Sequence, residues 1–296
     1  MGRTPPSPRR PRRARPPHTE RPELERYDAS DTALAQRILD PHYDVVRLLA
    51  RGAVACTHLV RDREAGRELV ARVLRWEVAK DETARAHLRR LTRAGLSLAH
   101  PNIVRTFAMS RDEEPVPYAI CEFVDGTDLA SLLQQGGRLP AENAVRIARD
   151  VAAALEAAHA HGIVHGSLRP SDILVTAGVH AKIYEFDSPL FGDSGVLGNP
   201  RYAAPEQLQD PGSGARAPAD VYALGAIFHE MLTGEDPFPA ASAMKGLRTK
   251  LEEPPTAAPA AAPPVQELLR RMLDPEARRR PTAAAVRAAL EPASPA

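Results

Sequence analysis

The spacing of apolar residues changes once along this chain, shortly after residue 123. Up to that point most segments resemble strands, with one helical segment at residues 81–99 among them. After residue 127 helical spacing dominates, and the longest such segment, residues 141–162, ends at a glycine. We therefore expect a small strand-rich lobe followed by a larger helical lobe, with a ligand-binding cleft between them. The strand-like segments are residues 43–52, 55–62, 66–76, 102–110 and 117–124.

Length and composition argue against several classes of protein. The 296 residues are 43% hydrophobic, which is enough for one large domain or two lobes around a sizeable core. A net charge of +1 argues against a dedicated nucleic-acid binder, which usually carries a strongly basic face. No apolar run is long enough to cross a bilayer, and the N-terminus lacks the apolar stretch of a secretory signal. Because two cysteines are too few for a disulfide framework, we expect a reducing, cytoplasmic environment.

The N-terminal segment is rich in arginine and proline. Residues 1–17 contain six arginines and no acidic residue, and they offer almost nothing apolar to bury. We expect residues 1–42 to be a disordered tail with a lead-in to the folded part, and residues 291–296 to be a short C-terminal tail. A solvated tail is the simpler interpretation. The alternative is an electrostatic arm for acidic partners, anionic lipid or nucleic acid.

Five segments in the second half of the chain resemble motifs of the eukaryotic-type Ser/Thr protein kinase family, which also occurs in bacteria. They are GIVHGSLRPSDILV, AKIYEFD, GNPRYAAPEQL, DVYALGAIFHEMLTGEDPF and LDPEARRRP. The resemblance extends over residues 43–290, and the order and spacing of all five segments fit the family. It implies an α+β, protein-kinase-like bilobal fold, with a small antiparallel β-rich N-lobe at residues 43–124 and a larger helical C-lobe at residues 125–290.

Several residues of these motifs match positions that hold the helical lobe together. The resemblance implies that Glu206 and Arg280 form a buried ion pair, in which each charge compensates the other. Asp220 matches an aspartate that accepts backbone N–H bonds from the catalytic loop. His165 and Phe186 match two stacked apolar positions. We expect these five residues to have structural roles.

The residues that would hold the nucleotide phosphates differ from the family pattern. The loop G-x-G-x-x-G-x-V keeps one of its three glycines, Gly52, to let backbone N–H groups approach phosphates. Arg72 stands where a lysine touches the α- and β-phosphates, and a guanidinium is larger and planar. The glutamate that would hold this cation falls at Leu91, and no acidic residue occurs between Glu82 and Asp112. We therefore expect Arg72 to lack its usual partner. The other three loop positions are Ala50, Ala55 and Thr57.

The resemblance also implies where a nucleotide would contact the chain. Cys121 lies at the strand end that would line the nucleotide cleft, and Cys56 lies in the roof of that cleft. We expect both cysteines to be small apolar fillers rather than reactive thiols. The candidate nucleotide-binding residues are Gly52, Thr57, Val70, Arg72, Cys121, Glu122, Phe123 and Leu174.

The catalytic loop and the metal-binding triplet are altered as well. Ser167 stands where the family has an aspartate that accepts the substrate proton, and a neutral serine is a poor base. Arg169 stands at the lysine of this loop, Asp172 replaces a metal-binding asparagine, and Glu185 replaces the aspartate of the DFG triplet. Asp172 and Glu185 are therefore candidate Mg²⁺ ligands. The alternative is two solvated or salt-bridged carboxylates.

The segment that carries activating phosphates in the family offers few hydroxyl groups here. Gly166 replaces an arginine that would contact a phosphorylated segment, and Asn199 replaces the usual threonine. We therefore expect no phosphorylation switch of the ordinary type. The hydroxyl residues of this segment are Ser188, Ser194 and Tyr202.

Two main functions follow from this pattern. The leading interpretation is a pseudokinase, a catalytically impaired domain that regulates or scaffolds other proteins, with weak nucleotide binding at most. The alternative is an active, atypical ATP-dependent Ser/Thr kinase or other transferase built around Arg72, Asp172 and Glu185. An electrostatic adaptor acting through the arginine-rich tail is a third hypothesis. The resemblance implies ATP and Mg²⁺ as ligands, and the altered residues argue against both. We expect protein partners, and no nucleic acid beyond weak contacts of the tail.

Overall fold

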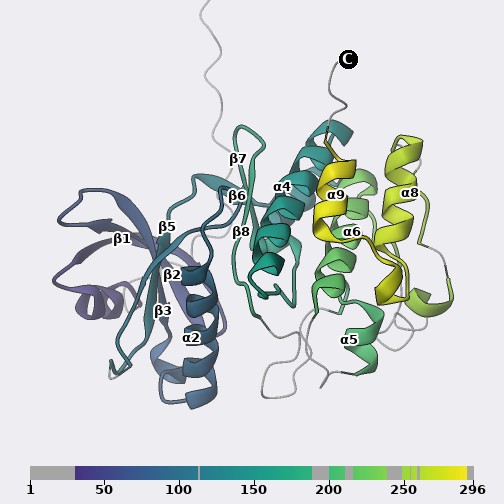
Figure 1. The fold of residues 1–296 in the computed structure, drawn as a ribbon. Coiled ribbons are helices and arrows are strands. Elements are labelled where there is room, and N and C mark those ends of the chain that lie inside the picture. The colour runs from purple at the N-terminus through teal and green to yellow at the C-terminus, as the bar shows by residue number, and fades with distance from the viewer. Residues whose placement is uncertain are drawn as a thin grey trace, which may run out of the picture.

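The computed structural model describes residues 31–112, 114–188, 200–210, 216–238, 249–253, 255–258 and 261–291. It confirms the expected α+β class, because an antiparallel β-rich lobe is followed by a larger helical lobe (Figure 1). The expectations for the arginine-rich tail and for residues 292–296 lie outside the described residues. Within the described part, no helix is long and apolar enough to cross a membrane.

The N-lobe is a five-stranded sheet in the order β1-β2-β3-β5-β4, in which all neighbouring strands are antiparallel. One helix, α2 (Glu82–Ser97), packs beside it, and the carboxylate of Asp81 caps its start by accepting from the N–H of Thr83 at 2.9 Å. The short 3-10 helix η1 (Trp76–Val78) precedes α2. The strands are β1 (Tyr43–Arg51), β2 (Ala55–Asp62), β3 (Glu68–Leu74), β4 (Thr106–Met109) and β5 (Tyr118–Glu122).

The N-lobe begins earlier than the sequence analysis placed it. Residues 31–39 are helical rather than a lead-in, and Ala35 and Leu39 are buried in the apolar core of this lobe. The side chain of Gln36 anchors this helix to β1, because it accepts from the N–H of Val45 at 2.8 Å and donates to the carbonyl of Tyr43 at 3.0 Å. The spacing of Ala35, Ile38 and Leu39 puts them on one helical face, and burial of that face makes the segment part of the lobe.

The strand predicted at residues 102–110 is also shorter than expected, and its first part links the two lobes. Ile103 forms an isolated bridge with Ile183, a residue of the C-lobe. The N–H of Val104 donates to the carbonyl of Ile183 at 2.9 Å, and the N–H of Ile183 donates to the carbonyl of Asn102 at 2.9 Å. Residues 102–104, just before β4, are thereby paired with the strand that leads to the candidate metal ligand Glu185.

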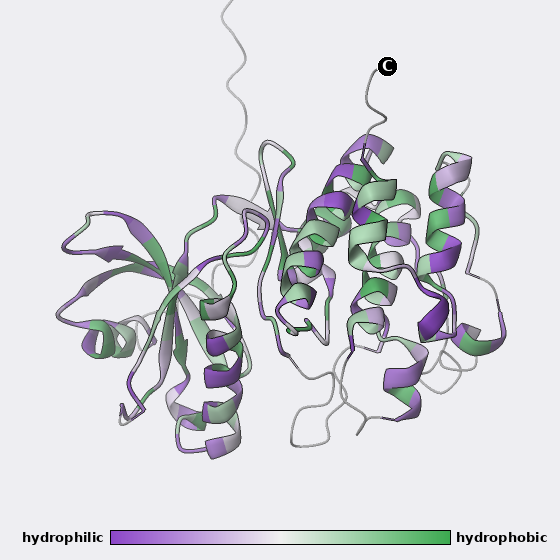
Figure 2. Ribbon diagram, in the orientation of Figure 1, coloured by the Kyte–Doolittle hydropathy of each residue, from purple (hydrophilic) through white to green (hydrophobic). Residues whose placement is uncertain are grey.

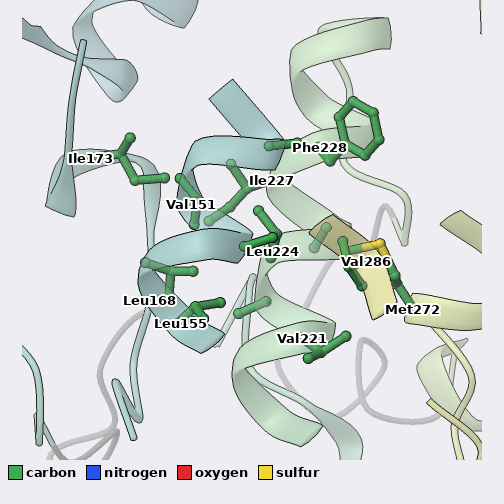
Figure 3. Close-up of a cluster of buried hydrophobic side chains, with 14 of the residues drawn as sticks. Val151, Leu155, Leu168, Ile173, Val221, Leu224, Ile227, Phe228, Met272 and Val286 are labelled. Carbon is green, nitrogen blue, oxygen red and sulfur yellow. The ribbon is translucent and has the colours of Figure 1, made fainter. Parts of the chain in front are cut away.

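The C-lobe is built around the helix α6 (Ala217–Thr233). This helix is buried on nearly all sides, and Figure 2 shows mostly apolar colours along it. Figure 3 shows how Val151 and Leu155 pack near Leu224 and Ile227 in this core. The remaining elements are β6 (Gly126–Asp128), α3 (Leu129–Gly136), α4 (Ala141–Ala160), η2 (Pro170–Asp172), β7 (Ile173–Thr176), β8 (Ala181–Ile183), α5 (Pro205–Gln209), α8 (Pro263–Met272), η3 (Ala277–Arg279) and α9 (Ala283–Ala289).

Glu206 and Arg280 meet in this lobe as a two-pronged ion pair, with N···O distances of 2.7 and 2.8 Å. The Arg280 side chain is 0% exposed, whereas that of Glu206 is 34% exposed, so only the cation is fully buried. Arg280 also donates to the carbonyls of Asp274 at 2.8 Å and Pro218 at 3.0 Å. Its guanidinium lies 4.8 Å from the centre of the Tyr222 ring. The pair therefore fastens α5 to the start of α6 and to the segment before α9.

Replacing Glu206 with alanine should lower the free energy of unfolding by roughly 3 kcal/mol, because the buried guanidinium of Arg280 loses its counter-charge. Glu267→Ala is a matched control, since Glu267 accepts two hydrogen bonds from Arg270 on the exposed face of α8. That change should cost less than about 1 kcal/mol. Urea unfolding measures both variants, and equal small losses would contradict a stabilising role for the Arg280 pair.

Candidate functional site

A cavity of about 660 Å³ is lined by residues of both lobes. Its roof comes from β1, β2 and the turn between them, and its floor from β7 and the segment after β8. A cavity of this size is typical of small-molecule sites. The structure places all eight candidate nucleotide-binding residues along it: Gly52, Thr57, Val70, Arg72, Cys121, Glu122, Phe123 and Leu174.

The roof turn is closed on itself. The N–H of Gly52 donates to the carbonyl of Ala55 at 2.9 Å, and a Cβ at Gly52 would lie only 2.9 Å from the same oxygen. Arg75 holds the turn from the end of β3, through its backbone N–H to Val54 at 2.9 Å and its guanidinium to Ala53 at 3.1 Å. The remaining glycine of the motif is thus needed for the turn itself, and its N–H is already used.

Arg72 reaches across the cavity to Glu185 and forms an ion pair with it. Leu91, which stands at the position of the usual glutamate, is buried and lines the cavity. Arg72 nevertheless has a carboxylate partner, which comes from the C-lobe. Burial raises the pKa of Glu185, but the guanidiniums of Arg72 and Arg169 outweigh it and hold this pKa below its ordinary value. Glu185 is therefore an ionised partner at neutral pH.

Arg169 extends this pair into a chain of four charges. Its Nε donates to Asp172 Oδ1 at 3.0 Å, and its Nη2 lies 3.7 Å from Glu185 Oε2. The hydroxyl of Ser171 donates to the same Asp172 oxygen at 3.2 Å. Burial raises the pKa of Asp172, and the charge of Glu185 adds to that effect, whereas Arg169 opposes it. The order along the chain is Arg72, Glu185, Arg169 and Asp172.

The candidate metal ligands do not fit a Mg²⁺ ion in this arrangement. One carboxylate oxygen of Asp172 and both carboxylate oxygens of Glu185 lie against guanidiniums. A Mg²⁺ ion would need such oxygens as ligands. Among the residues that the structure describes, no three or more His, Cys, Asp or Glu side chains form a group that could hold a metal. The geometry is that of salt-bridged carboxylates, the alternative interpretation of these two residues.

The catalytic loop is held by Asp220. Its two carboxylate oxygens accept from the backbone N–H groups of His165 and Gly166, each at 2.8 Å, and His159 Nε2 lies 2.8 Å from one of them. The rings of His165 and Phe186 lie 5.3 Å apart between centroids, and both are buried. The structural residues implied by the resemblance therefore lie together as expected.

Ser167 lies apart from the main cavity. It is half-buried and lines a small separate hollow with Tyr202 and Gln207. Tyr202 is buried, and its hydroxyl donates to Glu230 at 2.8 Å, so it has a packing role. Of the other hydroxyl residues in the segment, Ser188 is half-buried, and Ser194 lies outside the described residues together with Asn199.

Sequence reasoning did not single out the rear wall of the cavity, where small residues let α2 approach β4. A Cβ at Gly95 would lie 2.3 Å from Thr106 Oγ1, which in turn lies 3.8 Å from Cys121 Sγ. The cavity extends to these residues as well.

The two cysteines are both held in the thiol form. Burial raises the pKa of the Cys121 thiol. Burial, and after it the charge of Asp31, raises the pKa of Cys56 to about 11. Both thiols are therefore protonated at neutral pH, which favours their interpretation as fillers.

Gly95→Ala should destabilise the protein although alanine is about 1 kcal/mol better than glycine inside a helix, because the new Cβ collides with Thr106. Removing the colliding hydroxyl in the double variant Gly95→Ala/Thr106→Ala should recover the loss measured for Gly95→Ala. Thermal melting of the two single variants and the double variant tests this coupling. Additive effects would mean that α2 and β4 are not in close contact here.

A double-mutant cycle on Arg72→Met and Glu185→Gln should give a coupling energy of about 2 kcal/mol, because the two charges are desolvated together. The half-exposed pair between Arg287 and Glu156 serves as a control cycle, with an expected coupling below about 1 kcal/mol. Urea unfolding of each single and double variant provides the four free energies of each cycle. Simple additivity at Arg72 and Glu185 would contradict the pairing.

Comparison with known proteins agrees with this architecture. A family model described as a protein kinase domain matches residues 43–289. Serine/threonine-protein kinase PknB of Mycobacterium leprae is 31% identical over 211 residues, which are 68% of this chain and 34% of that protein. Serine/threonine-protein kinase PksC of Streptomyces coelicolor is 33% identical over 246 residues, 77% of this chain and 44% of that protein. This chain thus spans less than half the length of these relatives. The chain belongs to the protein kinase family.

Proposed function

We propose that this domain is a catalytically impaired member of the family, which regulates or scaffolds protein partners and binds a nucleotide weakly. The observation that carries the proposal is the chemistry of the cleft. A serine occupies the position of the catalytic base, and the cation of β3 is paired with the residue that would hold the metal.

The base position supports this proposal directly. Ser167 lies at the aspartate position of the loop, and the described residues offer its hydroxyl no hydrogen-bond partner that could activate it. General base catalysis typically contributes about 10²- to 10⁴-fold to a rate. A neutral hydroxyl without an adjacent base is a poor proton acceptor, which supports a loss of this contribution.

The charge arrangement supports it independently. Phosphoryl transfer depends on cations placed against the phosphates and on an exact in-line geometry, with little covalent chemistry by the protein. Here Arg72 contacts Glu185, and Arg169 contacts Asp172. These contacts occupy carboxylate oxygens that would have to hold metal ions, which supports the proposal of impaired catalysis.

The second candidate is an active, atypical ATP-dependent Ser/Thr kinase. The relatives favour it more directly than they favour the first candidate, because PknB, PksC and a second Streptomyces coelicolor protein are all named serine/threonine-protein kinases or probable ones. That second protein, SCO3848, is 30% identical over 260 residues, 82% of this chain. An active site would have to be built around Arg72, Asp172 and Glu185, after rearrangement of their ion pairs.

We expect the purified full chain to incorporate no radiolabelled phosphate into general protein substrates above a heat-killed control. Ser167→Asp alone should not restore turnover, because the cation and carboxylates of the cleft stay mispaired and residues that act as a unit are strongly non-additive. The informative comparison is with the combination Ser167→Asp, Arg72→Lys, Leu91→Glu and Glu185→Asp, with both variants checked for folding.

Two results of these assays would contradict the proposal of impaired catalysis. Turnover by the unmodified chain that disappears in Arg72→Ala would favour the second candidate. Turnover of Ser167→Asp alone in the ordinary kinase range of roughly 1–100 s⁻¹ would mean that the remainder of the site is competent.

A further inference from the structure

We propose that the cleft binds a nucleoside phosphate without a divalent cation, and that N–H groups of Arg72 and Arg169 hold the phosphate oxygens in its place. This inference rests on the nucleotide-binding part of the proposed function. It starts from the disagreement between the metal that the family implies and the groups that line this cleft.

The charges at the floor of the cleft balance one another. Two guanidiniums and two carboxylates contact one another in sequence, from Arg72 through Glu185 and Arg169 to Asp172. This cluster is balanced without any added ion. A site with unmatched carboxylates repels phosphate until cations neutralise it, whereas a balanced cluster imposes no such requirement.

Arg72 lies beside the place that a metal ion on Glu185 would take. Its backbone lies in the middle of the sheet, opposite Thr57 of β2 and Ala119 of β5. Its side chain is 20% exposed and that of Glu185 is 18% exposed. A divalent cation on Glu185 would therefore lie beside a fixed guanidinium in a poorly solvated place, where repulsion between like charges is strong.

Both arginines keep hydrogen-bond donors that the described residues do not use. A guanidinium carries five N–H groups. Arg72 uses Nη2 on Glu185, and no described residue accepts a hydrogen bond from its Nη1. Arg169 donates through Nε to Asp172, its Nη2 lies 3.7 Å from Glu185, and its side chain is 48% exposed. The unused N–H groups suit phosphate oxygens, which guanidinium binds through paired, charge-assisted bonds.

The remaining glycine of the roof turn offers no N–H group that could replace these arginines in phosphate binding. The N–H of Gly52 is bonded to Ala55 in the closed turn, so it is not available to a phosphate. Phosphate recognition in this cleft therefore depends on the two arginines, and the ligand class is a nucleoside di- or triphosphate whose oxygens accept from their unused N–H groups.

The test is calorimetric titration of the full chain with ADP and with ATP, in EDTA and again in Mg²⁺, together with thermal melting under each condition. We expect binding in EDTA that is at least as tight as in Mg²⁺, because Mg²⁺ only lowers the charge of the ligand. Arg169→Gln should weaken binding about tenfold, the loss expected for one charge-assisted hydrogen bond. Since Arg169 is half-exposed, this variant is expected to fold. Glu185→Gln should tighten binding, because it releases the guanidinium of Arg72.

The matched control is Arg287→Gln, which removes an arginine from a comparable ion pair with Glu156, between α9 and α4. It should leave nucleotide affinity unchanged. Binding that requires Mg²⁺ or Mn²⁺, equal losses in the Arg169 and Arg287 variants, or no binding by the folded chain would each overturn the inference. None of these results requires turnover, so they are distinct from the phosphoryl-transfer result that would contradict the proposed function.

Discussion

The ion pair between Arg72 and Glu185 joins the two lobes at the point where this family places its phosphate and metal chemistry. Arg72 is fixed by the central strand β3, and Glu185 follows β8, which is itself bridged to the N-lobe through Ile103 and Ile183. Because both charges are poorly solvated, each depends on the other for compensation. Arg169 continues the contact, because it lies 3.7 Å from Glu185 and donates to Asp172.

The helical lobe is organised independently of that chemistry. Asp220 accepts two backbone N–H bonds from the catalytic loop, and Arg280 is held by Glu206 and backbone carbonyls. These contacts need only a carboxylate and a guanidinium in the right places, and they are complete although Ser167 stands at the base position. The shape of the helical lobe therefore does not depend on which residues line the cleft.

Much of the fold could be predicted from the sequence, and the errors have identifiable causes. The change from strand-like to helical spacing located the two lobes, because periodicity reports directly which face of an element is buried. The helix at residues 31–39 was missed, since Ala35 and Leu39 form a short apolar face whose burial depends on the N-lobe core they contact. The closeness of α2 to β4 was also missed, because the small size of Gly95 has meaning only beside Thr106.

The sequence by itself determined which chemical groups the cleft contains. It established that no acidic residue follows Glu82 in α2, that a serine stands at the base position and that two carboxylates lie near the metal position. Only the tertiary structure decided which charge meets which. Arg72 and Glu185 are 113 residues apart, and no local periodicity relates residues at that separation. Their contact arises from the packing of one lobe on the other, and burial at that junction makes an ion pair more favourable than two separate charges.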